Sequence, residues 1–373
     1  PVLPILLVLQ VLPARPDFPV PPVLTVARID KITRVAHHSS IASLARTAHY
    51  CPSCPYCQPD GGEDTRLSLQ QRLQLIRACC ELGLTTLRLT GGEPLLAPDL
   101  DALLQAIQRG RNSRHDPLHQ LQEVALTTNG TLLDGCRAEQ LKQAGLDRIT
   151  ISLDAAEGEA AARMAGLQGG AVAGERLVRQ VQDGIAAACA ASFDPSCGEL
   201  KLNAVIQRGI NDDQLLPLAG LARQQGMELR LIEYMDVGNR NGWSAAEVVP
   251  ASELLSQLQQ RWPLEPLGRP QHGTASRWRY RDGAGHVAAV ASISQPFCGD
   301  CNRLRVTAEG MAYTCLFAEQ GHDLRPFLGT DSSTDELQAA LKAIWQRRTD
   351  RYSEEREQRQ GEFRQPAEMA YLG

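Results

Sequence analysis

Five short runs of apolar and β-branched residues recur along the middle of the chain, which is the pattern of β-strands. They cover residues 85–90, 123–128, 148–153, 200–206 and 228–234. Stretches with helical periodicity separate the runs, over residues 68–83, 100–110, 136–145, 174–191 and 212–226. Several of these stretches end at glycine, the usual helix stop. Strands that alternate with helices predict a parallel α/β sheet joined by right-handed crossovers.

Five such repeats fit an open or closed parallel barrel, with a sixth strand expected before Cys51. Ligands of these folds meet the carboxyl ends of the strands. In this chain those ends are polar, at residues 90–94, 127–130, 152–154 and 233–235. The pattern therefore predicts a functional face at one edge of the sheet.

The first 48 residues differ from the rest. The opening PVLPILLVLQVLPARPDFPVPP carries seven prolines in 22 positions. Its longest proline-free apolar run, residues 5–12, is too short to span a bilayer. It also lacks the basic start and the cleavage site of a signal peptide. We therefore set residues 1–48 apart as a disordered segment or a misread start, and we expect a cytoplasmic protein without membrane contact.

Composition places the remainder among ordinary globular proteins. Hydrophobic residues make up 43% and charged residues 22% of the chain, so a sizeable core is expected. The net charge of −5 gives no electrostatic reason to expect nucleic acid as a partner.

Eleven cysteines occur without an export signal, which makes a disulfide framework improbable. Five of them are expected to be small buried apolar residues: Cys79, Cys80, Cys136, Cys189 and Cys197. The other six fall into two groups of three.

The first group is the run CPSCPYC, with Cys51, Cys54 and Cys57. Zinc usually takes four ligands in a closed site, whereas a [4Fe–4S] cluster is ligated by C-x2-C-x2-C runs in bacterial ferredoxins. Three thiols without an obvious fourth favour the cluster. The TGGEP segment downstream adds two glycines that allow close approach by a ligand, and Glu93 offers a carboxylate to an ammonium group. An ordinary strand-to-helix turn is the alternative.

The second group is Cys298, Cys301 and Cys315. A zinc site completed by His322 is the alternative to a second cluster. Arg303 and Arg305 lie between these cysteines on one face of an extended segment, which suggests an anionic ligand. A solvated basic strand is the alternative for the two arginines.

From about Cys54 onward the chain resembles the GTP 3′,8-cyclases, radical S-adenosylmethionine enzymes of molybdenum cofactor biosynthesis. The resemblance is carried in order by CPYCQPDGG, LRLTGGEPLL, LTTNGTLL, GLDRITISLD, KLNAVIQRGINDD, ELRLIEYMDVG and PFCGDCNRLRVTAEG. It implies an incomplete TIM-type (β/α)6 barrel over residues 49–245 and a C-terminal iron–sulfur and GTP-binding region over residues 246–373.

The resemblance also implies the ligands of each site. The metal ligands of two [4Fe–4S] clusters would be Cys51, Cys54 and Cys57, and Cys298, Cys301 and Cys315. S-adenosylmethionine would contact Gly91, Gly92, Glu93, Thr128, Ser152 and Met235. GTP would be held by Arg88, Lys201, Arg230, Arg303 and Arg305.

The implied reaction begins with reductive cleavage of S-adenosylmethionine to a 5′-deoxyadenosyl radical. That radical takes hydrogen from C3′ of GTP, and the resulting carbon radical attacks guanine C8, which gives (8S)-3′,8-cyclo-7,8-dihydroguanosine 5′-triphosphate. The implied partners are flavodoxin or ferredoxin as reductant, cyclic pyranopterin monophosphate synthase as the next enzyme, and a second copy of the chain in a homodimer.

Four positions depart from the family pattern. Tyr50 stands where the first cluster ligand is expected, and Cys51 follows one residue late, a displacement of up to about 3.5 Å. Thr86 replaces a lysine, Arg46 lies outside the expected strand context, and Gly373 stands alone where the family ends in two glycines. These departures leave two alternatives open: an inactive relative that binds GTP or one cluster, or a radical S-adenosylmethionine enzyme with another substrate.

Overall fold

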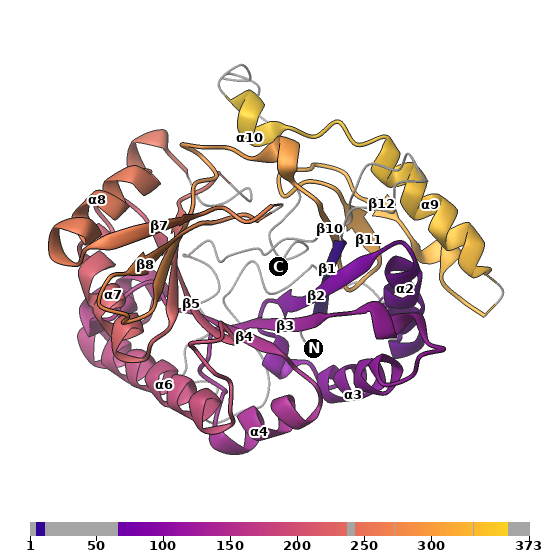
Figure 1. Ribbon diagram of the computed structural model, residues 1–373, viewed down its shortest axis with the longest axis horizontal. Helices are drawn as coiled ribbons and strands as arrows, with labels where there is room; N and C mark the ends of the chain where they lie inside the picture. Colours follow the sequence, from indigo (N-terminus) through magenta and orange to yellow (C-terminus); the bar gives the residue numbers. More distant parts are fainter. Residues whose placement is uncertain (1–4, 12–65, 237–242, 272, 331, 357–373) are drawn as a thin grey trace.

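A computed structural model describes residues 5–11, 66–236, 243–271, 273–330 and 332–356 (Figure 1). The strands are β1 Ile5–Val11, β2 Leu84–Gly91, β3 Glu123–Thr128, β4 Arg148–Ser152, β5 Leu200–Ile206, β6 Glu228–Glu233, β7 Leu264–Gly268, β8 Ser276–Tyr280, β9 His286–Val290, β10 Arg303–Val306, β11 Met311–Tyr313 and β12 His322–Asp323. The α-helices are α2 Leu69–Glu81, α3 Leu100–Arg111, α4 Gly135–Gln143, α5 Gly158–Ala165, α6 Gly170–Ala190, α7 Leu215–Gln224, α8 Ala251–Arg261, α9 Thr334–Gln346 and α10 Tyr352–Glu355.

The described strands form a single mixed sheet in the order β12-β11-β10-β1-β2-β3-β4-β5-β6-β9-β8-β7. Its middle is parallel, because β2 to β6 pair in sequence order and β9 pairs parallel with β6. The sheet curves into an open ring with α2, α3, α4, α6 and α7 outside it (Figure 1). The predicted α/β fold, an incomplete TIM-type barrel, is confirmed.

The five predicted strands all form, and two of them, β3 and β5, have the predicted bounds. The sixth parallel strand of the described chain is β9, which the hydrophobic pattern did not identify. The segment directly before Cys51 lies outside the described residues, and the described strand that precedes Cys51 in the chain, β1, is antiparallel to β2. Because β9 continues the sheet from β6, the sheet runs uninterrupted across the expected domain boundary at residues 245 and 246.

The proline-free run of the N-terminal segment forms β1. This strand is antiparallel to both of its neighbours, β2 and β10. It therefore joins the parallel half of the sheet to β10, which follows Cys301 of the second cysteine group. The remainder of residues 1–48 lies outside the described part of the chain.

The two faces of the parallel strands differ in chemistry. In β4, Ile149 and Ile151 belong to the hydrophobic core that the strands share with the helices. The residues that alternate with them, Arg148, Thr150 and Ser152, project to the opposite, concave face. β5 and β6 repeat this alternation, so a polar and charged surface lines the inside of the open ring.

The outer helices are well delimited. Ser68 and Gln71 form a capping box at the start of α2, and the same helix buries Cys79 and Cys80. Burial raises the pKa of Cys80 to about 12. The expectation of burial is wrong for Cys136 and Cys197, which are exposed.

Among the described helices, none is both long and apolar enough to cross a membrane.

Candidate active site

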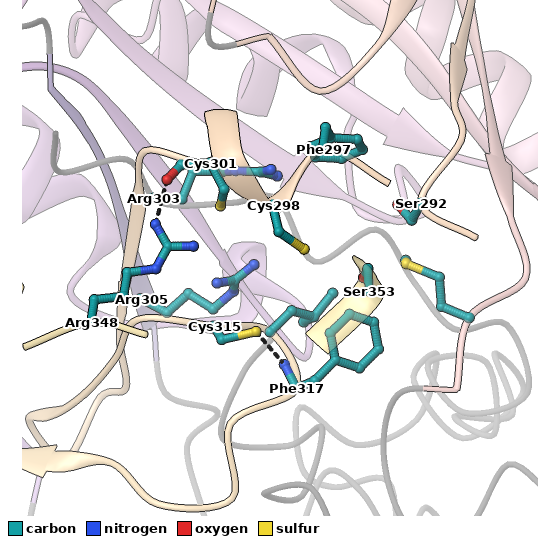
Figure 2. Close-up of a pocket in the computed structure, with 12 residues that line it drawn as sticks. Ser292, Phe297, Cys298, Cys301, Arg303, Arg305, Cys315, Phe317, Arg348 and Ser353 are labelled. Carbon is teal, nitrogen blue, oxygen red and sulfur yellow. Dashed lines mark hydrogen bonds between the residues drawn. The ribbon is translucent and has the colours of Figure 1, made fainter. Parts of the chain in front are cut away.

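The three cysteines of the second group line one pocket beside β10. Cys298 begins the short 3-10 helix η5, Cys298–Asp300, Cys301 follows it, and Cys315 comes just after β11. All three line one open pocket together with Arg303 and Arg305. Figure 2 shows the three cysteine side chains turned toward the same space.

The arrangement of these thiols fits a cluster better than a single ion. In the described residues, no three His, Cys, Asp or Glu side chains are close enough to hold one metal ion, and His322 does not line the pocket. Among the residues that the structure describes, the three thiols do not form a closed zinc site with His322. A [4Fe–4S] cube holds its thiolates at separate corners, so it accepts ligands that are spread around a pocket.

Two buried arginines line the same pocket. Arg303 is 8% exposed and Arg305 is 2% exposed, which rules out a solvated basic strand. Within the described chain neither forms a salt bridge, and the Nε and Nη1 atoms of Arg305 have no hydrogen-bond partner. Burial, together with neighbouring Arg303, lowers the pKa of Arg305 to about 10. Buried cations without counter-ions fit an anionic occupant. The thiolate ligands of a cluster are anionic, and so are phosphate groups.

The nearby arginines also change the pKa of Cys301. Burial alone raises the pKa of the Cys301 thiol, but the guanidiniums of Arg303, Arg348 and Arg305 outweigh it, so the net direction is downward. Arg348 also donates a hydrogen bond to the backbone carbonyl of Cys301. Cys301 is thus biased toward the thiolate, the form that ligates metals.

The chain segment around α10 covers this pocket. The ring of Tyr352 stacks on Phe317 with 4.5 Å between centroids, and its hydroxyl donates to Asp236 over 2.7 Å. Arg356 forms an ion pair with the same carboxylate at 2.8 Å. Met235, which precedes Asp236, lines the pocket. The carboxyl end of β6 and the second cysteine group therefore share one wall.

The TGGEP segment forms a turn that ties two strand ends together. Gly91 ends β2 with φ at 148°, a value that favours glycine, and the exposed Gly92 follows it. The buried carboxylate of Glu93 accepts hydrogen bonds from the Thr128 hydroxyl at 2.7 Å and from the Asn129 N–H at 2.8 Å. Glu93 and Thr128 are therefore brought together, and the carboxylate links β2 to β3.

Other polar residues at the strand ends have structural partners. Asp154 accepts from the Val205 N–H at 2.9 Å, and Glu233 accepts from the N–H groups of Ile293 and Ser294 at 2.8 and 2.9 Å. Ser152 differs, because its buried hydroxyl has no hydrogen-bond partner in the described residues. Of these three, Ser152 is the side chain left available to a ligand.

Three arginines lie in one row across the sheet. Arg305 of β10 and Arg88 of β2 both register with Val8 of β1. Arg88 and Arg148 both register with Ala125 of β3. Residues in one row of a sheet share a face, so these guanidiniums occupy every second strand of the concave surface.

A second group of cations lies on the same face of the sheet, on β5, β6 and β8. The carboxylate of Glu228 lies 3.1 Å from Lys201 Nζ, 2.9 Å from Arg230 Nε and 2.6 Å from Arg277 Nε. Arg230 Nε makes no hydrogen bond despite that distance, because its direction is unfavourable. Burial and the nearby charge of Arg230 lower the pKa of Lys201 to about 7. The pKa of Glu228 is held far below its usual range, since the surrounding cations outweigh its burial.

The predicted GTP residues therefore lie on one concave surface, but at the middle and amino ends of their strands. Lys201 is the second residue of β5 and Arg230 the third of β6. Sequence reasoning missed Arg148, Glu228 and Arg277. Alternation within the strands was the available signal, because side chains an even number of residues apart on a strand share a face. Arg148 therefore shares a face with Ser152, and Glu228 shares one with Arg230.

Five of the expected features lie outside the described residues: Cys51, Cys54, Cys57, Gly373 and the context of Arg46. Thr86, where the family carries lysine, begins the central part of β2 and registers with Glu123.

Two family models match the chain. The model of the Radical SAM superfamily covers residues 49–222, and that of Molybdenum Cofactor Synthesis C covers residues 227–354. Among solved structures, SuiB of Streptococcus suis aligns with 75% of this chain and 59% of its own, at 14% identity and a TM-score of 0.46.

Curated relatives match much more closely. The GTP 3′,8-cyclase of Synechococcus sp. (strain CC9605) is 66% identical over 82% of this chain and 87% of its own length. Those of Parasynechococcus marenigrum (strain WH8102) and Xanthomonas campestris pv. campestris (strain B100) are 60% and 45% identical, over 82% and 83% of this chain and 87% and 85% of their own lengths. The chain belongs to the GTP 3′,8-cyclase family of the radical S-adenosylmethionine superfamily.

Proposed function

We propose that this chain is a GTP 3′,8-cyclase that forms (8S)-3′,8-cyclo-7,8-dihydroguanosine 5′-triphosphate. One observation carries the proposal: buried cations run across the concave face of the sheet and end at the pocket of the second cysteine group. A nucleoside triphosphate carries several negative charges and is held by several cations together.

Within this proposal the chain's residues divide the work. Arg88, Lys201 and Arg230 hold the phosphates, while Arg303 and Arg305 hold the nucleotide beside Cys298, Cys301 and Cys315. Gly91, Gly92, Glu93, Thr128, Ser152 and Met235 form the pocket for S-adenosylmethionine. The helices packed outside the sheet and the α10 segment keep water from the reacting atoms.

The proposal includes two [4Fe–4S] clusters, one on each cysteine group. A reduced cluster, when bound, supplies the electron that cleaves S-adenosylmethionine. Support for the second cluster is the pocket with three thiols, the lowered pKa of the Cys301 thiol and the unpaired guanidinium of Arg305. Support for the first is the cysteine run itself, which falls within the part of the chain that matches the Radical SAM model.

We further infer a cytoplasmic homodimer that takes electrons from flavodoxin or ferredoxin and passes its product to cyclic pyranopterin monophosphate synthase. These proposals rest on family membership.

The deciding experiment is anaerobic reconstitution followed by assay of 5′-deoxyadenosine with and without GTP. We expect its formation to depend on S-adenosylmethionine and reductant and to rise with GTP, together with the cyclised nucleotide. A chain that binds about four irons and GTP but yields no 5′-deoxyadenosine would instead be an inactive relative whose first cluster is lost at Cys51. If 5′-deoxyadenosine forms but GTP neither stimulates it nor is consumed, the substrate is of another class.

A further inference from the structure

One arginine beside the implied GTP residues has no assigned role. Arg277 lies on β8, in the antiparallel hairpin that follows the parallel strands along the sheet. Its Nε donates to Glu228 over 2.6 Å, and the opposite oxygen of that carboxylate contacts Lys201 and Arg230. One carboxylate thus holds three cations at a single point.

Strand register places Arg277 on the same face as Arg230. Both register with Ala288 of β9, so the two arginines flank a small side chain within one row. Continuing that row through β5 and β4 gives Asn203 and Ser152. The row therefore extends from the hairpin to the strand end where Ser152 presents its unpaired hydroxyl.

Charge around Glu228 is not balanced. Arg230 and Arg277 bring two permanent positive charges to one carboxylate, and Lys201 adds a third below its pKa of about 7. Arg148 nearby is paired with Glu123 at 2.7 Å. Among the described residues at least one positive charge therefore remains without a carboxylate, in a region where Glu228 is 2% exposed. Uncompensated cations in a desolvated site are costly unless an anion joins them.

The exposure and the contacts of Arg277 suit it to bind such an anion. Its side chain is 34% exposed, and among the described residues Glu228 is its one hydrogen-bonding partner. The Nε is therefore fixed while the two terminal amino groups stay accessible. A guanidinium held in this way presents a fork to a phosphate without losing much further freedom.

We propose that Arg277 is a phosphate-binding residue of the nucleotide site and that Glu228 is the internal counter-ion that orients it together with Lys201 and Arg230. This inference rests on the proposed function. It predicts that affinity for the nucleotide depends on the number of phosphates through Arg277.

The test compares the reconstituted wild-type protein with Arg277→Gln and Arg277→Lys, by equilibrium binding of GTP, guanosine and inorganic triphosphate. We expect Arg277→Gln to weaken GTP and inorganic triphosphate by about 10- to 100-fold, the effect of one charge-assisted hydrogen bond. Guanosine binding should stay unchanged. Arg277→Lys should recover part of the loss, because the charge is retained.

Arg279→Gln is the matched control, since Arg279 lies two residues along β8 and pairs with Glu265 at 2.7 Å on the surface. It should bind all three ligands as the wild type does. Equal affinity of wild type and Arg277→Gln for inorganic triphosphate would overturn the inference, and so would an equal loss for guanosine. The proposed function has its own failure, a wild type that binds inorganic triphosphate but not GTP.

Discussion

Lys201 of β5 lies 3.1 Å from Glu228 of β6, in an ion pair almost wholly removed from solvent. Arg230 and Arg277 contact the same carboxylate. This carboxylate stands at the centre of the basic surface, and its removal leaves like charges facing one another in a desolvated place.

Glu228→Gln should destabilise the protein strongly. Removing one partner of a buried ion pair leaves an uncompensated charge and costs about 3–5 kcal/mol. Denaturant unfolding at neutral pH measures the change in the free energy of unfolding. Glu265→Gln, which breaks a surface pair with Arg279, should change it little; similar losses for both variants would contradict the central role of Glu228.

Binding of GTP should weaken as pH rises through 7. The pKa of Lys201 is lowered to about 7, so its ammonium is charged below that pH and neutral above it. The comparison is with Lys201→Arg, whose guanidinium stays protonated throughout.

Between about pH 6 and pH 8 we expect the ratio of the wild-type Kd to the Lys201→Arg Kd to rise by up to about tenfold, because the charged fraction of a group with a pKa of about 7 falls about tenfold over that range. The ratio cancels the titration of the phosphates themselves. A ratio independent of pH would show that Lys201 keeps its proton or does not contact the nucleotide.

Cys298→Ala should reduce the iron bound after reconstitution. A [4Fe–4S] cluster on the second cysteine group contains four irons, so the content should fall from about eight to about four per chain. Iron and sulfide analysis gives the result directly. Cys136→Ala is the control, because Cys136 is exposed on α4; its iron content should match the wild type.

Arg305→Met should stabilise the protein without clusters while weakening its binding of nucleotide. Arg305 is buried without a carboxylate partner in the described residues, and a buried uncompensated charge is replaced here by an apolar chain of similar reach. We expect the free energy of unfolding to rise by about 1–3 kcal/mol.

Denaturant unfolding of the cluster-free protein and GTP binding of the reconstituted protein measure the two effects. Arg325→Met, at an exposed pair with Asp323, should change neither. A loss of stability in Arg305→Met would mean that the guanidinium makes a stabilising contact, against the reading of an anion-binding residue.

Much of the fold was predictable from residue patterns. The strands 123–128 and 200–206 were delimited correctly because short runs rich in apolar and β-branched residues stand between helical patterns. β9 was not identified, since its short run VAAV follows the antiparallel strand β8 directly instead of a helix and so breaks the alternation of strands and helices. Motifs with rare residues, such as the cysteine groups and TGGEP, pointed to the chemistry without any coordinates.

The order of strands and helices, the alternation of apolar and polar positions, and the residue types available for metal, cofactor and nucleotide can all be read from the chain alone. Which of these residues meet depends on the folded arrangement. Glu93 proved to link two strands, and Glu228 proved to hold Lys201, Arg230 and Arg277 together. The reason is that register and sheet curvature, which depend on contacts far apart in the chain, set the distances between side chains, whereas local patterns specify only the face on which each side chain lies.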